Sequence, residues 1–489
     1  MLPLPGAGGG SGGAPPGSGA GSGHGGSAES SSSGGGDAPA SPDLHTAGAT
    51  PRRIPTYYED VAPLLAAHCT MCHAPGRIGP FSLLTLDEAR AVAALSAARA
   101  ADRTMPPWGA QPSSACAPRF GWKNDLSLTD AEIAVLQAWA DTGMKAGDPA
   151  AGPPPGDPPI DDVPLDSLDM TIAPETPFSA GGDVDQFRCF TIDPGLTEPK
   201  FVNGLRVVAG VPSMIHHVTV LADPQGLSAG FADESGSYEC EVDAGVGSQV
   251  LVNWTPGSGK TQLPPGAGFP LQPGTRLVMQ IHYHPAGAPA ASDATKVELD
   301  FLDGPPTQMA RLIGAGNVAA YHLDGTGLLP GPNDFGPPIF LVPAGVRGHT
   351  ETITWRVPSD KGGAPLPEMA IYEIKPHMHF AGEAITLDIH RPSPAPSEPA
   401  DECLVGVPRW DFRWQRAYAY DVPVSALPRI HSGDDMTVRC TYDNTVDNKA
   451  LVEQLLRAHL PGPVDLHLGQ TALDEMCFAA ITVLAPASP

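Results

Sequence analysis

Apolar residues follow two different repeats, one on each side of a proline-rich stretch near residue 150. Before it, segments 57–68, 87–101 and 129–141 carry the apolar pattern of helices. Thr129 fits the N-cap of the last segment, with Glu132 three positions later as in a capping box. The first part of the chain is therefore predicted to be a small all-α module.

Beyond the proline-rich stretch, short alternating apolar runs are separated by Gly and Pro. The clearest examples are Leu205–Val208, His217–Leu221, Leu277–His284, Lys296–Phe301, Glu351–Val357 and Ala384–Ile389. Alternation with this turn spacing is typical of antiparallel sandwiches and jelly rolls. The segment is too long for one sandwich, so we expect two all-β jelly-roll sandwiches after the helical module.

Composition refines these boundaries. The chain has 489 residues with 56 Gly and 57 Pro, and its first 40 residues hold 15 Gly and 8 Ser. Such a segment cannot bury enough apolar surface to offset ordering entropy. Seven of the 16 residues in Pro149–Pro164 are proline, which indicates a semi-rigid spacer. The expected parts are a disordered tether (1–53), a helical domain (54–148), a linker (149–166) and two sandwiches (167–312 and 313–489).

Charge and hydropathy restrict the partners. With 28 basic and 54 acidic residues the net charge is −26, which argues against nucleic acid or an anionic membrane. No apolar run reaches the roughly 20 residues that a membrane span needs. Met1-Leu-Pro-Leu-Pro runs into glycine without a signal-peptide pattern, so we expect the start to be truncated or mis-assigned. A membrane tether through the N-terminal segment is compatible with this composition.

Cys69-Thr-Met-Cys72-His73 is a CxxCH motif, the attachment signature of c-type haem. Two thiols at this spacing bond the two vinyl groups of one porphyrin, and the adjacent His becomes the proximal iron ligand. A redox dithiol or a partial zinc site are the alternatives, but no second CxxC and no thioredoxin-like strand–helix pattern accompanies the motif. The helical module around it resembles cytochrome c.

The distal haem ligand is predicted from the methionines. Met105, in Thr104-Met-Pro-Pro-Trp108, follows His73 at a suitable distance in a loop that prolines restrain. Met144 is the second candidate. Met71 lies inside the motif and cannot reach the distal face.

Three histidine clusters lie in the predicted strands: His216-His217, His282-Tyr-His284 and His377-Met-His379. Imidazole suits copper, zinc and iron. Because His377 and His379 are two apart, their rings share one face of a strand. His216 and His217 are consecutive, so they can bind one metal only if the strand ends or bulges there, or if they use different ring nitrogens.

The order of motifs resembles the copper type II, ascorbate-dependent monooxygenases, the family of peptidylglycine hydroxylating and dopamine β-monooxygenases. The resemblance covers about Asp183 to Leu484. The motifs that carry it are Cys189, His216-His217, Cys240, Leu251-Val-Asn-Trp254, Pro264–Phe269, Gln280–Pro285, His377-Met-His379, Cys440 and Asp474–Cys477. His-Tyr-His-Pro looks closest to the dopamine β-monooxygenase version.

The resemblance implies two coppers per chain. His216, His217 and His282 would bind the electron-transfer copper, with His284 a neighbour. His377, His379 and Met476 would bind the copper at which dioxygen is activated, and would form the catalytic site. A soft thioether favours Cu(I), the state that meets dioxygen. Met476 has a simpler interpretation as a core methionine, because an apolar strand follows it.

The same resemblance implies the disulfides Cys189–Cys240 and Cys440–Cys477. Cys116 and Cys403 are left over; they either pair across modules or stay free. Disulfides, copper and covalent haem together predict a periplasmic, cell-surface or secreted protein.

The chain departs from the peptide-amidating enzymes where those hold the substrate carboxylate. Lys375, Phe478 and Ala480 occupy the matching positions. Lys375 is a point charge without the bidentate fork of Arg, and the other two suggest a more apolar pocket. We therefore do not expect a glycine-extended peptide, and the substrate class stays open between small and peptide-like molecules.

The expected activity is hydroxylation of a C–H bond with O2. Electrons would arrive one at a time from the fused haem, from ascorbate, or from a redox donor protein. Two alternatives remain: an exported haem/copper electron-transfer or copper-binding protein without hydroxylase activity, and a jelly-roll surface protein without copper.

Overall fold

The computed structural model describes residues 53–152, 160–182, 184–240, 244–246, 249–285, 287–317, 328, 338–361, 364–469, 471 and 473–487. The expected tether, apart from residue 53, lies outside the described residues, as does 153–159 of the expected linker. Residues 54–489 form one compact unit. Its described part is mainly β-sheet with few helices, which confirms the expectation of β-sandwich domains.

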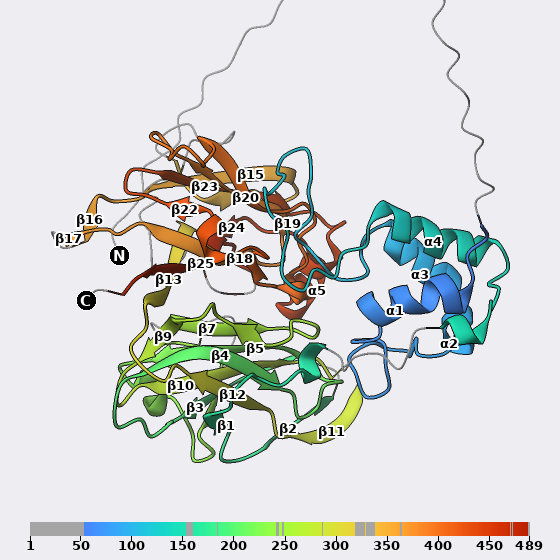
Figure 1. Cartoon of the computed structure of the whole chain (residues 1–489), viewed down its shortest axis with the longest axis horizontal. Helices are drawn as coiled ribbons and strands as arrows, with labels where there is room; N and C mark the ends of the chain where they lie inside the picture. The colour runs from blue at the N-terminus through green and yellow to red at the C-terminus, as the bar shows by residue number, and fades with distance from the viewer. Residues whose placement is uncertain are drawn as a thin grey trace, which may run out of the picture. The chain divides into compact units, whose positions relative to one another are not determined.

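Residues 54–148 carry four short α-helices preceded by a π-helical turn (Figure 1). They are η1 (Tyr57–Val61), α1 (Ala62–His68), α2 (Leu86–Ala91), α3 (Ala93–Ala101) and α4 (Asp130–Asp141). The expected helix over 87–101 is split at Val92. The predicted capping box of Thr129 and Glu132 is present, and Thr85 with Glu88 forms another. Leu65, Leu136 and Trp139 are buried in the core of this module.

The first sandwich occupies the green and yellow part of Figure 1. One sheet has the order β1-β12-β4-β9, and the other has the order β6-β3-β10-β5-β7. Their bounds are β1 (Met170–Ile172), β3 (Gln186–Ile192), β4 (Lys200–Val208), β5 (Ile215–Asp223), β6 (Ser237–Glu239), β7 (Gln249–Trp254), β9 (Ala267–Leu271), β10 (Arg276–Tyr283) and β12 (Lys296–Phe301). Minor strands are β2 (Phe178–Gly182), β8 (Thr261–Gln262) and β11 (Ala288–Asp293), and η3 (Ile160–Asp162) and η4 (Leu227–Gly230) are short 3-10 turns.

The second sandwich has one sheet in the order β13-β25-β18-β21 and another in the order β15-β23-β19-β20. Their bounds are β13 (Gln308–Asn317), β15 (Arg347–Arg356), β18 (Met369–His377), β19 (Gly382–His390), β20 (Asp401–Val407), β21 (Tyr418–Ala419), β23 (Asp435–Asp443) and β25 (Cys477–Pro486). Smaller elements of this sandwich are β14 (Leu341–Val342), β16 (Asp360–Lys361), β17 (Ala364–Pro365), η5 (Phe412–Trp414), η6 (Val424–Ala426), β22 (Arg429–Ile430), α5 (Lys449–Arg457) and β24 (Leu466–His467). A short 3-10 turn, η2 (Pro149–Ala151), follows the helical module.

The two sandwiches share a continuous sheet, because β9 pairs in parallel with β13 at Ala267 and Gln308. β13 also pairs with β25 along its whole length. The expected boundary between 312 and 313 therefore falls inside β13, which begins at Gln308. Alternation alone could not reveal this, since the strand looks the same whichever sheet it joins.

The expected linker 149–166 is partly packed against the first sandwich. Asp161 is buried, and its carboxylate accepts hydrogen bonds from the backbone N–H groups of Gly257 (2.7 Å) and Gly259 (2.8 Å) and from Trp254 Nε1 (3.2 Å). Three donors compensate the desolvation of this carboxylate. The end of the segment is thus part of the first sandwich.

Six of the eight cysteines form disulfides: Cys189–Cys240, Cys440–Cys477 and Cys116–Cys403. The first two are the pairs that the family resemblance implies. The third shows that Cys116 and Cys403 pair with each other across modules, which was one of the two alternatives left open. Three disulfides are compatible with an extracellular or periplasmic location. Among the described helices, none has the length and apolar character needed to cross a membrane.

Candidate metal centres

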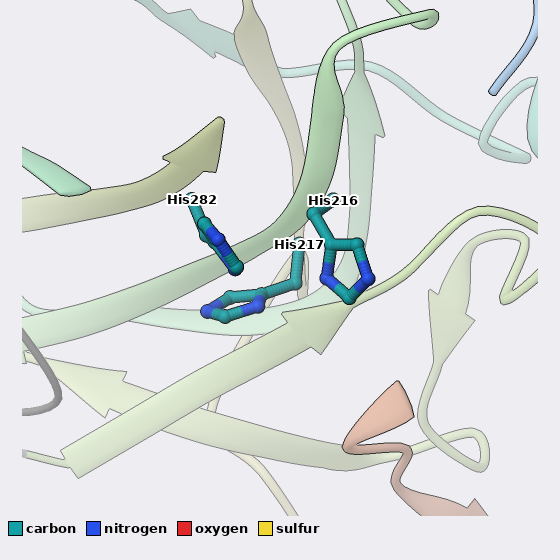
Figure 2. A group of neighbouring side chains, drawn as sticks. All are labelled: His216, His217 and His282. Carbon is teal, nitrogen blue, oxygen red and sulfur yellow. The ribbon is translucent and has the colours of Figure 1, made fainter. Parts of the chain in front are cut away.

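A β-bulge brings together His216 and His217 of β5 and His282 of β10 (Figure 2). His282 pairs with His217, but the next residue, Tyr283, pairs with Ile215, so His216 is the extra residue of the bulge. In a regular strand consecutive side chains point to opposite faces, and a bulge re-aims one of them. The bulge therefore satisfies the condition under which both histidines can serve one metal.

We call His216, His217 and His282 the three-histidine cluster. Candidate ligand nitrogens of the three side chains lie within 4.8 Å of one another, and all three residues are buried. Among the described residues, Nδ1 of His216 and Nδ1 of His282 have no hydrogen-bond partner. Buried polar atoms without a partner are rare in proteins and call for an explanation such as a bound ion.

Asp185, just before β3, orients this cluster. Its Oδ2 lies 3.0 Å from Nε2 of His282 and its Oδ1 lies 2.7 Å from Nδ1 of His284. The Phe187 ring stacks on His282 with centroids 4.1 Å apart. A carboxylate on one ring nitrogen sets the tautomer that leaves the other nitrogen free for a metal. His284 is not part of the cluster, and 46% of its side chain is exposed.

Burial lowers the pKa of His216 and of His217 well below the ordinary value, and neighbouring histidines add to the shift. Burial also lowers the pKa of His282. The neutral imidazole is the form that binds a metal. Near neutral pH the three imidazoles are therefore neutral, and a metal ion could bind them without displacing a proton from an imidazolium.

These shifts predict how the metal-free protein responds to acid. In the folded protein His216 and His217 stay neutral, whereas in the unfolded chain they bind protons below a pH of about 6.5. The free energy of unfolding should therefore be highest above that pH and fall as the pH drops below it. The slope approaches about 1.4 kcal/mol per pH unit for each such histidine. Urea unfolding with chelator at pH 7.5 and 5.5 measures this. His217→Leu should lose part of the dependence, and an unchanged dependence would contradict the assignment.

A second pair, His377 and His379, lies where β18 ends, with ring centroids 5.2 Å apart. Nδ1 of His377 is 2.7 Å from Oε1 of Gln415, and Nδ1 of His379 is 3.0 Å from the carbonyl oxygen of Asp474. Both Nδ1 atoms are thus engaged, which leaves the Nε2 atoms. Among the described residues, Nε2 of His379 is buried without a hydrogen-bond partner.

Glu475 holds the backbone of Met476 close to the backbone of His379. Its Oε2 accepts from the backbone N–H of His379 (2.9 Å) and of Met476 (3.2 Å), and its Oε1 accepts from the N–H of Ala381 (2.7 Å). Burial raises the pKa of Glu475 to about 8. Met476 is itself buried. One carboxyl group therefore fixes the backbone of His379 and that of Met476 together.

The candidate substrate residues lie on the same two strands. His377 pairs with Phe478 and Lys375 pairs with Ala480, and directly paired antiparallel residues share a face. Lys375 is engaged within the protein, because its Nζ donates to Oδ1 of Asn253 at 2.6 Å. The face beside His377 is thus lined by an aromatic ring and a small apolar residue.

Asn253 of β7 connects the two groups of histidines. Its Oδ1 also accepts from Oγ1 of Thr219 (2.7 Å), and its Nδ2 donates to the carbonyl oxygen of Gln415 (2.8 Å). Thr219 lies two residues after His217 on β5, and Gln415 holds His377. A hydrogen-bonded path therefore runs from the strand of one cluster to a residue of the other.

A cavity of about 610 Å³ contains the CxxCH motif. Cys69, Cys72, His73 and Met105 are among its lining residues. Nδ1 of His73 lies 3.1 Å from the carbonyl oxygen of Phe81, which leaves Nε2 for a ligand. Cys69 and Cys72 are the two cysteines outside the disulfides. The volume lies in the range of cofactor sites.

The methionines around the motif occupy different places. Met105 lines the cavity and is 39% exposed. Met144 packs against the helical core, and Met71 is buried with the β-sandwich core. Met105 and Met71 both line the cavity, and Met144 is not among its lining residues.

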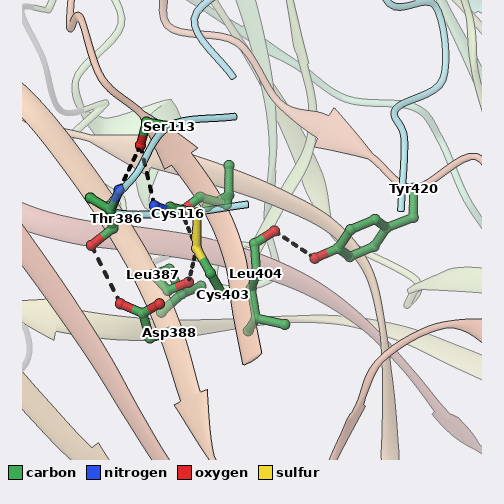
Figure 3. The surroundings of a disulfide bond; sticks show 10 residues. Ser113, Cys116, Thr386, Leu387, Asp388, Cys403, Leu404 and Tyr420 are labelled. Carbon is green, nitrogen blue, oxygen red and sulfur yellow. Dashed lines mark hydrogen bonds between the residues drawn. A yellow bond between two sulfur atoms is a disulfide. The ribbon is translucent and has the colours of Figure 1, made fainter. Parts of the chain in front are cut away.

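The segment 102–128, which we call the arm, leaves the helical module and runs along the second sandwich. The N–H of Lys123 donates to Ala419 (2.8 Å), and the ring of Trp122 stacks on Tyr420 at 4.8 Å. Figure 3 shows the Cys116–Cys403 disulfide joining the arm to β20. The sequence offered a cross-module Cys116–Cys403 pair as one alternative, but it did not reveal the rest of this docking, because its contacts are long-range.

We expect loss of this disulfide to reduce stability. The bond spans 287 residues, so the double variant Cys116→Ser/Cys403→Ser should lose about 2–5 kcal/mol of unfolding free energy, since the cross-link restricts the unfolded chain. Urea denaturation measures the change. Cys189→Ser/Cys240→Ser, which opens a span of 51 residues, is the matched control with a smaller expected effect. Wild-type stability in the first variant would contradict the expectation.

Comparisons with known proteins add little. No protein-family model and no curated protein matches the chain. Among solved structures, the match to the major capsid protein P2 from bacteriophage PM2 covers 65% of this chain and 98% of the capsid protein chain. The sequence identity is 9% and the TM-score is 0.25. The match to the VP2 subviral particle of infectious bursal disease virus covers 66% of this chain and 80% of the VP2 chain, with 11% sequence identity and a TM-score of 0.16.

Proposed function

We propose that this protein is a copper-dependent monooxygenase of the ascorbate-dependent type II kind, fused to a cytochrome c-like domain. The observation that carries the proposal is the pair of separate histidine groups on adjoining sandwiches, each with a buried imidazole nitrogen that lacks a partner among the described residues. The jelly-roll connectivity of that family and the two-copper assignment belong to this proposal.

The residues present fit copper. Three neutral imidazoles tolerate both oxidation states, and two imidazoles with a thioether favour Cu(I). His216, His217 and His282 would hold one ion, and His377, His379 and Met476 the other. Bound copper supplies one-electron redox chemistry and dioxygen activation. Asp185 and Gln415 keep the imidazoles oriented, and Glu475 keeps the backbone of His379 and Met476 in place.

The cavity around Cys69, Cys72 and His73 fits a covalent haem c. Two unpaired thiols lie beside an imidazole whose Nδ1 is bonded to a carbonyl, the arrangement that a proximal ligand needs. Haem supplies one electron at a time, and covalent fusion keeps it at high effective concentration near the copper domains. Met105 is the proposed distal ligand.

The proposed reaction is hydroxylation of a substrate C–H bond by O2. Phe478 and Ala480 line the face beside His377 with apolar groups, and the ammonium of Lys375 is already bonded to Asn253. The apolar face beside His377 favours a small substrate that presents an apolar C–H bond over a substrate anchored by a carboxylate. Electrons come from the haem, assisted or replaced by ascorbate.

Metal analysis with oxygen uptake tests the proposal. The purified protein should contain two coppers and one iron per chain, and O2 consumption should be coupled to a hydroxylated product. Two coppers and one iron without any hydroxylation across a panel of small C–H substrates would favour an electron-transfer protein instead. Absence of copper would contradict both and leave a structural surface protein.

A further inference from the structure

The cavity around the CxxCH motif is not enclosed by the helical module alone. Its lining also includes Asp185, His284, Trp414 and two members of the three-histidine cluster, His216 and His282. The residues proposed to hold haem and those proposed to hold the first copper therefore line one continuous space. The second histidine pair is not among its lining residues.

Trp414 of η5 is an aromatic residue that both lines the cavity and contacts the three-histidine cluster. Its ring centroid lies 5.1 Å from that of His216. The guanidinium of Arg416 lies 5.9 Å from the Trp414 ring and 5.8 Å from the ring of Trp108 in the arm. The tryptophan is thus held between the arm, the second sandwich and the three-histidine cluster.

Asp185 forms another connection. The carboxylate joins His282, a cluster member, to His284, which faces the cavity, through contacts of 3.0 and 2.7 Å. One carboxylate therefore connects His284 to the proposed copper ligand His282, and all three residues line the cavity.

Several contacts fix the residues around the cavity to one another. The helical module and the two sandwiches therefore do not have to associate before an electron passes between them. Arg416 is buried and donates to the carbonyl oxygens of Pro107 in the arm (3.0 Å) and of Pro256 in the first sandwich (2.8 Å). The Cys116–Cys403 disulfide ties the arm to the second sandwich. The helical module is thereby fixed against both sandwiches.

We propose that electrons enter the copper domains directly across this shared cavity, with Trp414 and the Asp185–His284 bridge as positioning residues. The inference rests on the proposed function. With both groups bound, a ferrous haem held at Cys69, Cys72 and His73 would give one electron to a Cu²⁺ held by the three-histidine cluster, so the iron would become ferric and the copper Cu⁺. A one-electron donor such as ascorbate then restores the ferrous haem. No diffusible carrier acts between the two centres.

Flash photoreduction by a flavin tests the route in the full-length, metal-loaded protein without O2. Haem reoxidation is followed at its α-band, and loss of the Cu²⁺ signal by freeze-quench electron paramagnetic resonance. We expect a first-order haem reoxidation whose rate is independent of protein concentration. Trp414→Leu and His284→Leu should slow it several-fold, and Trp414→Phe should restore most of the rate. His217→Leu, which lacks the first copper, should show no such phase.

Trp355→Leu, which replaces a partly buried tryptophan of β15, is the matched control and should leave the rate unchanged. The haem spectrum and the copper resonance of the Trp414 and His284 variants should match wild type, which separates a positioning role from a structural one. Full loading with equal rates in the Trp414 and His284 variants, or a rate proportional to protein concentration, would overturn the direct route alone. Absence of haem or copper would overturn the proposed function with it.

Discussion

Met476→Ile is expected to abolish hydroxylation while leaving the fold intact. Isoleucine keeps an apolar side chain of similar volume, and such swaps cost less than about 1.5 kcal/mol. It has no sulfur, so the second copper would lose its soft ligand. The loss in kcat/KM should exceed the roughly 10–100-fold that outer-sphere partners of a metal cost. Product formation, copper content and urea denaturation together measure the effect.

The control for this variant is Met436→Ile, at a fully buried core methionine of β23 in the same sandwich. It should keep its activity, because its cross-strand partners are Trp355 and Ile389, which are not proposed ligands. If Met476→Ile and Met436→Ile behave alike, Met476 is a core methionine and the second copper site is wrongly assigned. The three-histidine cluster should keep its copper in both variants.

His217→Leu should remove one copper per chain and stop multiple turnover. The cluster would keep only two imidazoles, and the electron store would be lost. The metal-free variant should be at least as stable as the metal-free wild type, because a buried imidazole is replaced by an apolar side chain. Copper should raise the unfolding temperature of the variant less than that of wild type, since bound metal stabilises only the state that binds it.

His390→Leu is the matched control, since His390 is half-exposed and its Nδ1 pairs with Asp401 at 2.7 Å. It should retain both coppers. A His217→Leu protein that still carries two coppers, or that is strongly destabilised without metal, would identify His217 as an ordinary core residue.

Local patterns in the sequence predicted much of the architecture. The capping box at Thr129 and the β-rich second part follow from periods of 3.6 or two residues within one element. His379 lies two residues beyond the end of β18, so the period of one strand does not place it beside His377. The pairs Cys189–Cys240 and Cys440–Cys477 were available only through the resemblance of ordered motifs. Haem, copper and hydroxylation remain proposals that these patterns motivate.

Other features depend on how distant segments pair. The sequence by itself determined which residues share a face of one strand or helix, because that geometry is set by the backbone period. Only the tertiary structure decided the bulge that re-aims His216, the Cys116–Cys403 pair and the strand that spans the expected boundary at 312. It also brought Asp185 to His282 and Glu475 to His379. Register and long-range contact are properties of the assembled sheets, so no local spacing encodes them.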